Sequence, residues 1–173
     1  MNDLSLKTVQ TVDISTPTQY WPHPENAVTF GRIVELIKSK PGTFCFAEIK
    51  SGGFLTAELV ARLVDDLKAN PREIVFISFD LSALLRVKQL LPQFKCFHVL
   101  KCFTAADGMQ WTKNSLDAGM DGVDLCAIPD VVTEALVQYV HSRGKEVAVW
   151  CSITTAQFNI DNVEVSRFVL LLL

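Results

Sequence analysis

The stretch "EIVFISFDLSALLRVKQLLP", residues 73–92, places a strand directly before a helix. Its first part, "EIVFISF" at 73–79, is nearly all apolar, which is typical of a strand buried on both faces of a parallel sheet. Asp80 is well placed to cap the following helix, and Pro92 ends it. This short spacing of strand and helix is that of one repeating unit in a parallel α/β protein.

The same alternation extends in both directions along the chain. It predicts five parallel strands, near residues 43–49, 73–79, 95–101, 121–126 and 145–151. A helix before the first strand has an apolar stripe of Phe30, Ile33, Val34 and Ile37. Asp130 is expected to cap the last helix of the series, and Gly144 suits the position just after that helix.

Periodicity alone leaves two architectures open, a doubly wound sheet and a (β/α)8 barrel. No GxGxxG or P-loop motif follows any of the expected strands, which argues against the nucleotide-binding versions of the doubly wound sheet. The length of 173 residues is that of a single domain, here residues 1–173.

Composition excludes several classes of partner. The net charge is −3 and no basic stripe is present, which argues against a nucleic-acid partner. The C-terminal "RFVLLLL" is far shorter than the roughly 20 apolar residues of a membrane span. The five cysteines (Cys45, Cys96, Cys102, Cys126 and Cys151) show no paired spacing and are expected to be buried free thiols. With no signal peptide at the N-terminus, a cytoplasmic location is expected.

Candidate functional residues lie where strands end, because sites in parallel α/β proteins gather there. In "FCFAEIKSGG", residues 44–53, alternation places Phe46, Glu48 and Lys50 on one face. There the Glu48 carboxylate can bind a hard cation and the Lys50 ammonium can meet a phosphate oxygen. The alternative is a surface ion pair. Trp150, at another strand end, is either an apolar wall of a substrate pocket or a buried core residue.

The three histidines are expected to be structural. His23 lies in a proline-rich loop, His98 in the middle of a strand and His141 near the end of a helix. None is at a strand end, so no catalytic residue is assigned.

Taken in order, several segments resemble the glycerophosphodiester phosphodiesterase family. They are "EIK", "VFISFDLSALLRVKQLLP", "GVDL" and "LVQYVHSRGKEVAVW", together with "DLSLKTVQTVDI" near the start, and the resemblance covers roughly residues 3–152. The resemblance implies a (β/α)8 barrel that uses a divalent metal, Mg or Ca, to hydrolyse glycerophosphodiesters to glycerol 3-phosphate and an alcohol. It also implies that Glu48 is a metal ligand, Lys50 contacts the phosphate and Trp150 lines the substrate pocket.

The sequence departs from the family pattern at its start and at its end. The family's first two strands carry a His-Arg pair, a Glu-x-Asp pair and a His-Asp pair, and no segment here matches them. "PHPEN" around His23 is only superficially similar to the family's Pro-Glu-Asn-Thr motif. The segment "NIDNVEVSRFVLLLL" at the end does not align with the family's last strand.

A barrel of this type takes about 250 residues, so we expect a partial barrel of five or six of the eight units. We expect the chain to be truncated, inactive by itself and at most a weak binder of metal. The tail from Val163 to Leu173 is expected to cover one sheet edge as a sixth strand, and open edges favour self-association. The alternatives are a non-catalytic module that binds a phosphodiester, a lipid headgroup or a protein, and a small doubly wound regulatory protein.

Overall fold

The computed structural model describes residues 30–40, 42–50, 53–150 and 168–172. The chain divides into two compact units, Met1–Pro41 and Gly42–Leu173. In the first unit, helix α2 (Phe30–Ser39) buries Phe30, Ile33, Val34 and Ile37, the stripe predicted from the sequence. A single domain over residues 1–173 stays a prediction.

Strands and helices alternate through the second unit at nearly the expected bounds. They are β1 (Phe44–Glu48), α3 (Gly53–Asp66), β2 (Ile74–Ser78), α4 (Leu81–Leu90), β3 (Lys95–Leu100), α5 (Ala105–Asp117), β4 (Gly122–Cys126), α6 (Glu134–Ser142), β5 (Glu146–Trp150) and β6 (Phe168–Leu172). All five strands predicted from the alternation are therefore confirmed.

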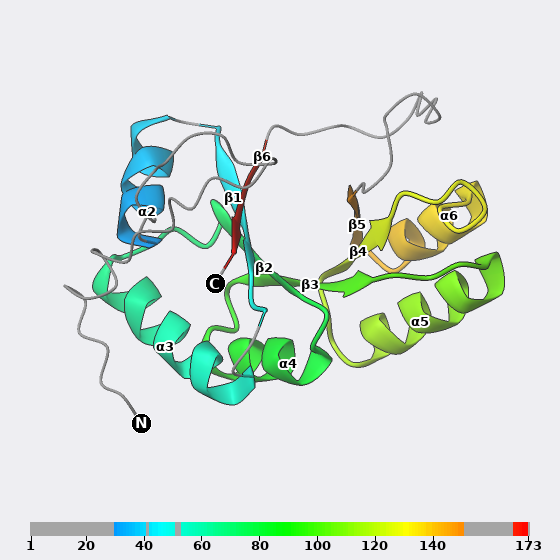
Figure 1. Ribbon diagram of the computed structural model, residues 1–173, viewed down its shortest axis with the longest axis horizontal. Helices are drawn as coiled ribbons and strands as arrows, with labels where there is room; N and C mark the ends of the chain where they lie inside the picture. Colours follow the sequence, from blue (N-terminus) through cyan, green and yellow to red (C-terminus); the bar gives the residue numbers. More distant parts are fainter. Residues whose placement is uncertain (1–29, 41, 51–52, 151–167, 173) are drawn as a thin grey trace, which may run out of the picture. The chain divides into compact units, whose positions relative to one another are not determined.

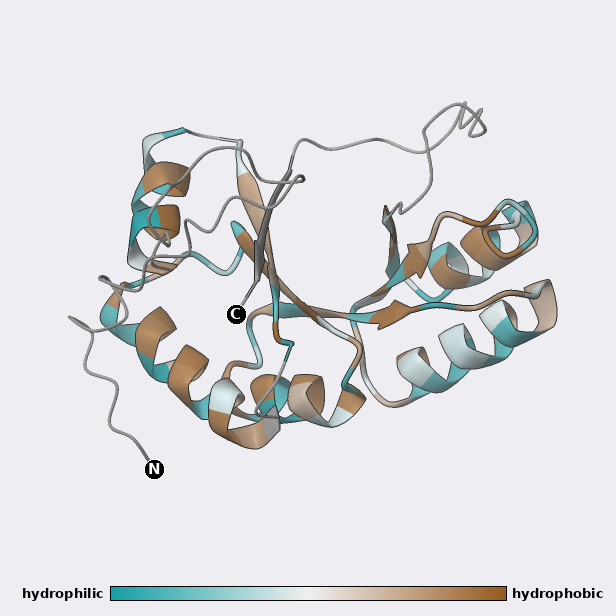
Figure 2. Cartoon of the chain, viewed as in Figure 1, coloured by the Kyte–Doolittle hydropathy of each residue, from teal (hydrophilic) through white to brown (hydrophobic). Residues whose placement is uncertain are grey.

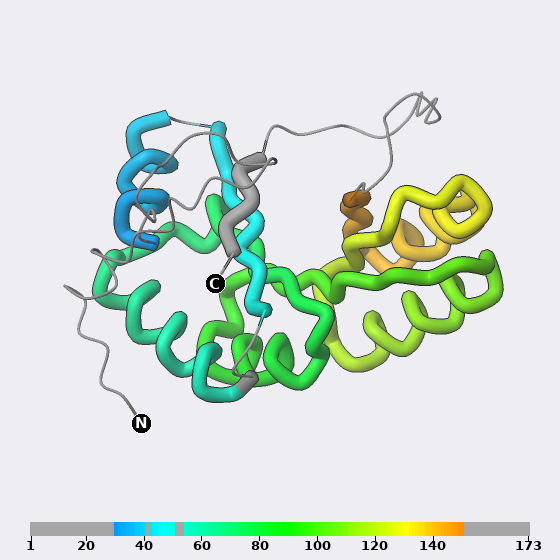
Figure 3. Tube along the Cα trace, in the orientation of Figure 1, coloured from blue at the N-terminus to red at the C-terminus, as the bar shows by residue number. Residues whose placement is uncertain are grey.

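The strands form one six-stranded sheet in the order β5-β4-β3-β2-β1-β6, and every neighbouring pair is parallel. From β1 to β5 the spatial order follows the chain, which Figure 3 shows as colours running from cyan to orange. The spatial order of the strands does not reverse anywhere between β1 and β5. The order confirms the arc of a (β/α)8-type barrel and argues against a doubly wound sheet.

The predicted sixth strand is present at the β1 edge. Strand β6 pairs with β1 in a register that runs from Phe44↔Phe168 to Glu48↔Leu172. The rest of the predicted tail strand lies outside the described residues. In the described part of the sheet, β5 and β6 are the two edge strands.

Helices cover one face of the sheet. Figure 1 shows α3, α4, α5 and α6 on the convex side of the curved sheet. Helices α4, α5 and α6 contact neighbouring strands, and α3 packs against α4. Between α5, α6 and the sheet lies a core of Leu100, Cys102, Leu116, Val123, Leu125, Val131, Leu136 and Val140. The strands are mostly brown in Figure 2, as expected for strands buried on both faces.

The concave face carries its own apolar cluster, made of side chains that alternate with those of the outer core. Its buried members are Phe46, Val75, Ile77, Phe97 and Val99, with Ala148 and Trp150 packed against them. This inner face leads toward the carboxyl ends of the strands, where the candidate site lies.

Two predicted helix signals are confirmed and one is wrong. The Asp80 side chain accepts hydrogen bonds from the N–H groups of Ser82 and Ala83, so Asp80 caps α4. Gly144 follows α6 with a φ of 66°, in the left-handed region that favours glycine. Asp130, however, does not cap α6. The carbonyl of Ile128 first accepts hydrogen bonds from the N–H groups of Val131 and Val132, which form a turn before the helix. Thr133 caps α6 instead, because its hydroxyl accepts a hydrogen bond from the N–H of Leu136.

The cysteine prediction holds for the described residues. Cys45, Cys96, Cys102 and Cys126 are buried free thiols, and Cys151 lies outside the described part of the chain. Among the helices described, none has the length and apolar content needed to cross a membrane.

Candidate active site

A pocket of about 350 Å³ opens on the concave face, near the carboxyl ends of the strands. Apolar side chains make up most of its wall, and these include Phe46, Ile77, Phe79, Val99 and Trp150. Three polar side chains interrupt this wall: Glu48, Lys50 and Asp124. A volume of this size, with a few polar groups in an apolar setting, is typical of a small-molecule site.

Glu48 and Lys50 reach the pocket together because alternate residues of a strand point to the same face. Glu48 is the last residue of β1, and its side chain is only 10% exposed. The Lys50 side chain, two residues later, is 52% exposed and places its Nζ 3.6 Å from Glu48 Oε2. The ammonium group therefore stands at the mouth of the pocket, beside a carboxylate that lies deeper.

Ser78 fixes the chain just before Lys50. The Ser78 hydroxyl donates a 2.6 Å hydrogen bond to the carbonyl of Ile49. The same oxygen accepts a 3.0 Å bond from the N–H of Asp80. Ser78 is buried, so these two bonds tie the end of β1 to the end of β2 where water is largely excluded.

Trp150 ends β5 and forms one wall of the pocket. Its ring meets that of Phe79 edge to face, with centroids 5.9 Å apart and an interplanar angle of 84°. It also packs against the apolar cluster of the concave face. The indole Nε1–H is buried and has no hydrogen-bond acceptor among the described residues. Trp150 thus combines the two sequence-based alternatives, being packed against the core and lining the pocket.

Asp124 belongs to "GVDL", one of the segments that carry the family resemblance, but no role was predicted for it from the sequence. It lies in the middle of β4, paired in register with Val99 on β3 and Ala148 on β5, and is 6% exposed. Burial, with a further contribution from the charge of Glu48, raises the pKa of Asp124 to about 7. The available signal was a single acid in the strand "GVDLC", on the same alternating face as Gly122 and Cys126.

Both ring nitrogens of His98 contact polar groups of other elements. Its Nδ1 lies 2.7 Å from the Ser115 hydroxyl, and its Nε2 lies 3.3 Å from the Phe79 carbonyl oxygen. Burial lowers the pKa of His98. With both ring nitrogens engaged by neighbouring helix and loop groups, the imidazole connects β3 to α5 and to the end of β2.

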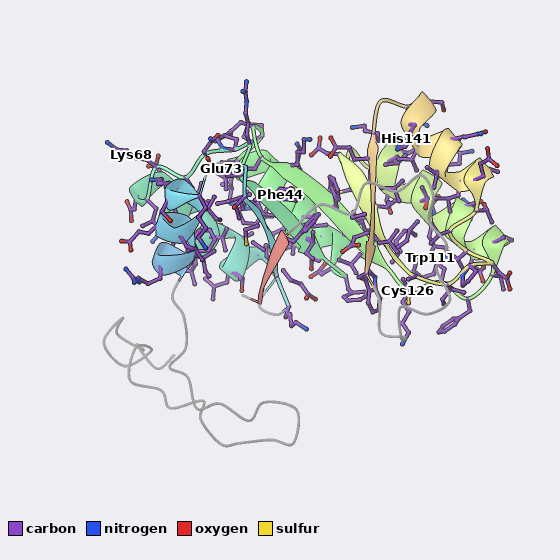
Figure 4. The ribbon with its side chains drawn as sticks, turned by 90° about the horizontal axis from the view of Figure 1, so that it is seen from above. Phe44, Lys68, Glu73, Trp111, Cys126 and His141 are labelled. Carbon is purple, nitrogen blue, oxygen red and sulfur yellow. The ribbon has the colours of Figure 1, made fainter. Side chains whose placement is uncertain are left out.

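The other histidines do not enter the pocket either. Figure 4 shows His141 toward the end of the sheet where Phe44 and Glu73 lie, opposite to Cys126. His23 lies outside the described residues. Within the described part of the chain, no histidine lines the pocket.

Comparison with known proteins identifies the relatives of this fold and site. The model of the "Glycerophosphoryl diester phosphodiesterase family" matches residues 2–163. The chain belongs to this family. No curated protein gave a significant match to the sequence.

Solved structures described as glycerophosphodiester phosphodiesterases, or as candidates for that activity, share the fold. A candidate enzyme from Galdieria sulphuraria has a TM-score of 0.64 and 18% identity, with 86% of this chain and 57% of that chain covered. An enzyme from Parabacteroides distasonis has a TM-score of 0.60 and 17% identity, with coverages of 76% and 54%. A candidate from Silicibacter pomeroyi has a TM-score of 0.61 and 16% identity, with coverages of 76% and 50%. The match spans 50–57% of the length of these structures.

Glycerophosphodiester phosphodiesterases are generally metal-dependent. Glu48 and Asp124 offer hard carboxylate oxygens, which suit Mg²⁺ or Ca²⁺. However, the described residues contain no group of three or more His, Cys, Asp or Glu placed to hold a metal. The Lys50 ammonium also lies 3.6 Å from Glu48 and opposes a cation there. These residues alone do not fit a complete metal site.

Proposed function

We propose that this pocket binds the phosphate of a glycerophosphodiester, or of its product glycerol 3-phosphate. The observation that carries the proposal is the meeting of Glu48, Lys50 and Trp150 around one pocket, although they come from β1 and β5 at opposite ends of the strand series. These are the three positions at which the family resemblance implies contact with metal or substrate.

Each of the three side chains has a role that matches its surroundings. Lys50, half-exposed at the pocket mouth, is available to pair with a phosphate oxygen. Trp150 and Phe79 supply a rigid apolar wall for the carbon atoms of the ligand. Glu48 is the ligand that this chain contributes toward a divalent cation, Mg or Ca, in the complete family site.

We further propose that this polypeptide by itself binds the ligand without hydrolysing it. General acid–base work on a leaving alcohol needs a group that exchanges protons near neutral pH, most often histidine. Of the described histidines, His98 is held by Ser115 and Phe79, and His141 lies toward the opposite end of the sheet. The described residues therefore support ligand binding by this pocket more than they support catalytic turnover.

A ³¹P NMR titration of glycerol 3-phosphate with the full chain tests the binding proposal. Lys50→Met should weaken binding about fivefold, the effect of losing one exposed charge contact of roughly 1 kcal/mol. Lys101→Met is the matched control, because Lys101 is also exposed and follows a strand end but lies over the Phe103 ring and outside the pocket. Equal affinities of the two variants would contradict a phosphate contact at Lys50.

A hydrolysis assay tests the second part. With glycerophosphocholine and either Mg²⁺ or Ca²⁺, the purified chain should give no turnover above background. Turnover that is lost in His98→Ala or His141→Ala would show that one of these histidines is catalytic.

The remaining parts of the proposal concern the setting of the protein. We propose a protein of lipid and glycerol metabolism, which is consistent with its family, and one without a nucleic-acid partner, which is consistent with its net charge of −3. A cytoplasmic location is proposed from the sequence alone. Self-association through the β5 and β6 edges is also proposed, since in the described sheet each has a neighbour on one side only. Light scattering over a range of concentrations measures it.

A further inference from the structure

Asp124 is a buried carboxyl group to which no other described residue forms a hydrogen bond or an ion pair. Its residue is 6% exposed, and its oxygens are not among the fully enclosed unpaired atoms of the described residues. Its neighbours in register, Val99 and Ala148, are apolar. The part of its surface that remains accessible lines the pocket.

In the described part of the unliganded protein, this carboxyl group can hydrogen-bond only to water in the pocket, and burial limits that contact. A buried polar group left without a hydrogen bond costs stability, and each such group in a native structure calls for an explanation. The described residues supply no partner for Asp124, whereas Glu48 in the same pocket already has Lys50 at 3.6 Å. Asp124 therefore differs from Glu48 in having an unused acceptor that faces the space a ligand would fill.

The chemistry of the pocket narrows the choice of ligand group. Apart from Glu48, whose charge acts on Asp124, the pocket wall at that depth is mostly apolar, so the described residues offer a ligand few other polar groups there. A phosphate held by Lys50 at the mouth carries its ester carbons inward, past Phe79 and Trp150. In a glycerol phosphate, those carbons bear hydroxyl groups, which are hydrogen-bond donors of the kind that an unpaired carboxyl group can accept.

We propose that Asp124 accepts a hydrogen bond from a glycerol hydroxyl and so selects a polyol phosphate over a phosphate ester that lacks hydroxyls. The inference rests on the proposed function, because it requires the phosphate to sit at Lys50. It adds a residue on β4 that determines specificity, separate from the residues that bind the phosphate. Discrimination of this kind is strong in enzymes, because an analogue without the hydroxyl leaves the buried polar group unpaired.

The test compares two probes on the full chain by ³¹P NMR, in buffer containing EDTA. The probes are sn-glycerol 3-phosphate and n-propyl phosphate, which share the phosphate and the three-carbon chain and differ in the hydroxyls. The wild type should bind glycerol 3-phosphate about tenfold more tightly than propyl phosphate. In Asp124→Leu this preference should vanish through loss of glycerol 3-phosphate affinity alone, while propyl phosphate binds as before.

Two further variants distinguish a loss of hydroxyl recognition from a loss of folded protein. Asp124→Asn retains a carbonyl acceptor and should keep part of the preference. Asp130→Leu makes the same substitution at an exposed position in the loop that follows β4, outside the pocket, and should change neither affinity. Thermal melts of all the variants verify that each is folded, and Asp124→Leu should be at least as stable as the wild type because it removes an unpaired buried carboxyl group.

The outcomes separate this inference from the proposal on which it rests. Equal binding of both probes to the wild type overturns the role of Asp124 and leaves the phosphate contact at Lys50 intact. Equal weakening of both probes in Asp124→Leu also overturns it, because the residue then supports the pocket and does not recognise hydroxyls. If neither probe binds to the wild type, the phosphate contact at Lys50 and the role of Asp124 are both overturned.

Discussion

Lys50 Nζ lies 3.6 Å from Glu48 Oε2 at the end of β1. The pair is asymmetric, since the lysine side chain is 52% exposed and the glutamate only 10%. The ammonium group can therefore reach a ligand phosphate while still compensating a carboxylate that lies deeper in the pocket. This arrangement favours an anion at the mouth and disfavours a free cation beside Glu48.

Free Mg²⁺ or Ca²⁺ should accordingly bind no tighter than about 1 mM, because one or two carboxylates are far fewer than the six or more oxygens these ions require. Calorimetric titration should give similar small heats for the wild type and for Glu48→Gln. Lys50→Met, which removes the opposing ammonium, should bind the cation more tightly than the wild type. Micromolar binding that disappears in Glu48→Gln is the result that contradicts this prediction.

Ser78 should matter for stability as well as for the site. In Ser78→Ala, the buried carbonyl of Ile49 and the N–H of Asp80 both lose their partner. We expect the free energy of unfolding to fall by about 1–3 kcal/mol. Urea denaturation measures the change, and glycerol 3-phosphate affinity should fall too because the backbone before Lys50 is less well held.

Ser142→Ala is the matched control for this substitution. The Ser142 hydroxyl also donates to a backbone carbonyl, that of Tyr139, but the residue is exposed on α6. Water can replace that bond, so its loss should change stability by less than about 0.5 kcal/mol. Similar losses in both variants would argue against a special role for the buried bond.

Gly122 opens β4 at a point where a side chain has no room. A Cβ atom there would lie 2.5 Å from the Glu146 carbonyl oxygen and 2.8 Å from the Phe97 ring. Because the first contact is with backbone, Gly122→Ala should destabilise the fold by about 3 kcal/mol in a denaturant titration. Gly108→Ala provides the comparison, since its closest contact is a Val131 methyl group and alanine favours the helix. Gly108→Ala should lower the free energy of unfolding clearly less than Gly122→Ala does.

The fold could be predicted largely from local signals. Apolar runs such as "EIVFISF" have the length and composition of buried parallel strands, and the polar caps and helical periods between them repeat at short spacing. The mistaken cap at Asp130 shows where such signals fail. Asp130 has a side chain that commonly caps helices, but the backbone makes an additional turn on Ile128 before α6 begins at Glu134.

The site could be predicted only in part. Glu48, Lys50 and Trp150 lie at strand ends, where parallel sheets gather functional groups, so their positions in the chain indicated them. Asp124 lies in the middle of a strand. Whether such an acid meets a partner, a pocket or solvent depends on side chains from β1, β3 and β5, and these are brought together only by the folded sheet.

The pH dependence of stability should carry the signature of Asp124. Its pKa is raised from 3.8 to about 7 in the folded protein, first by burial and then by the charge of Glu48. The folded state thus holds a proton that the unfolded state releases at lower pH. This contribution to stability is fully present below the unfolded pKa of 3.8, and it is lost as pH rises through about 7.

Denaturant titrations of the wild type and Asp124→Asn at pH 5 and pH 8 measure this effect. The asparagine variant cannot ionise, so its stability relative to the wild type should increase between the two values. His98 acts in the opposite direction, because its pKa is lowered from 6.5, so its contribution is present above 6.5 and is lost as pH falls through the lower pKa of the folded protein. Since both proteins contain His98, the difference between them cancels its effect and isolates Asp124. A difference that does not change between pH 5 and pH 8 would mean that the folded protein accommodates the charged carboxylate of Asp124 as readily as water does.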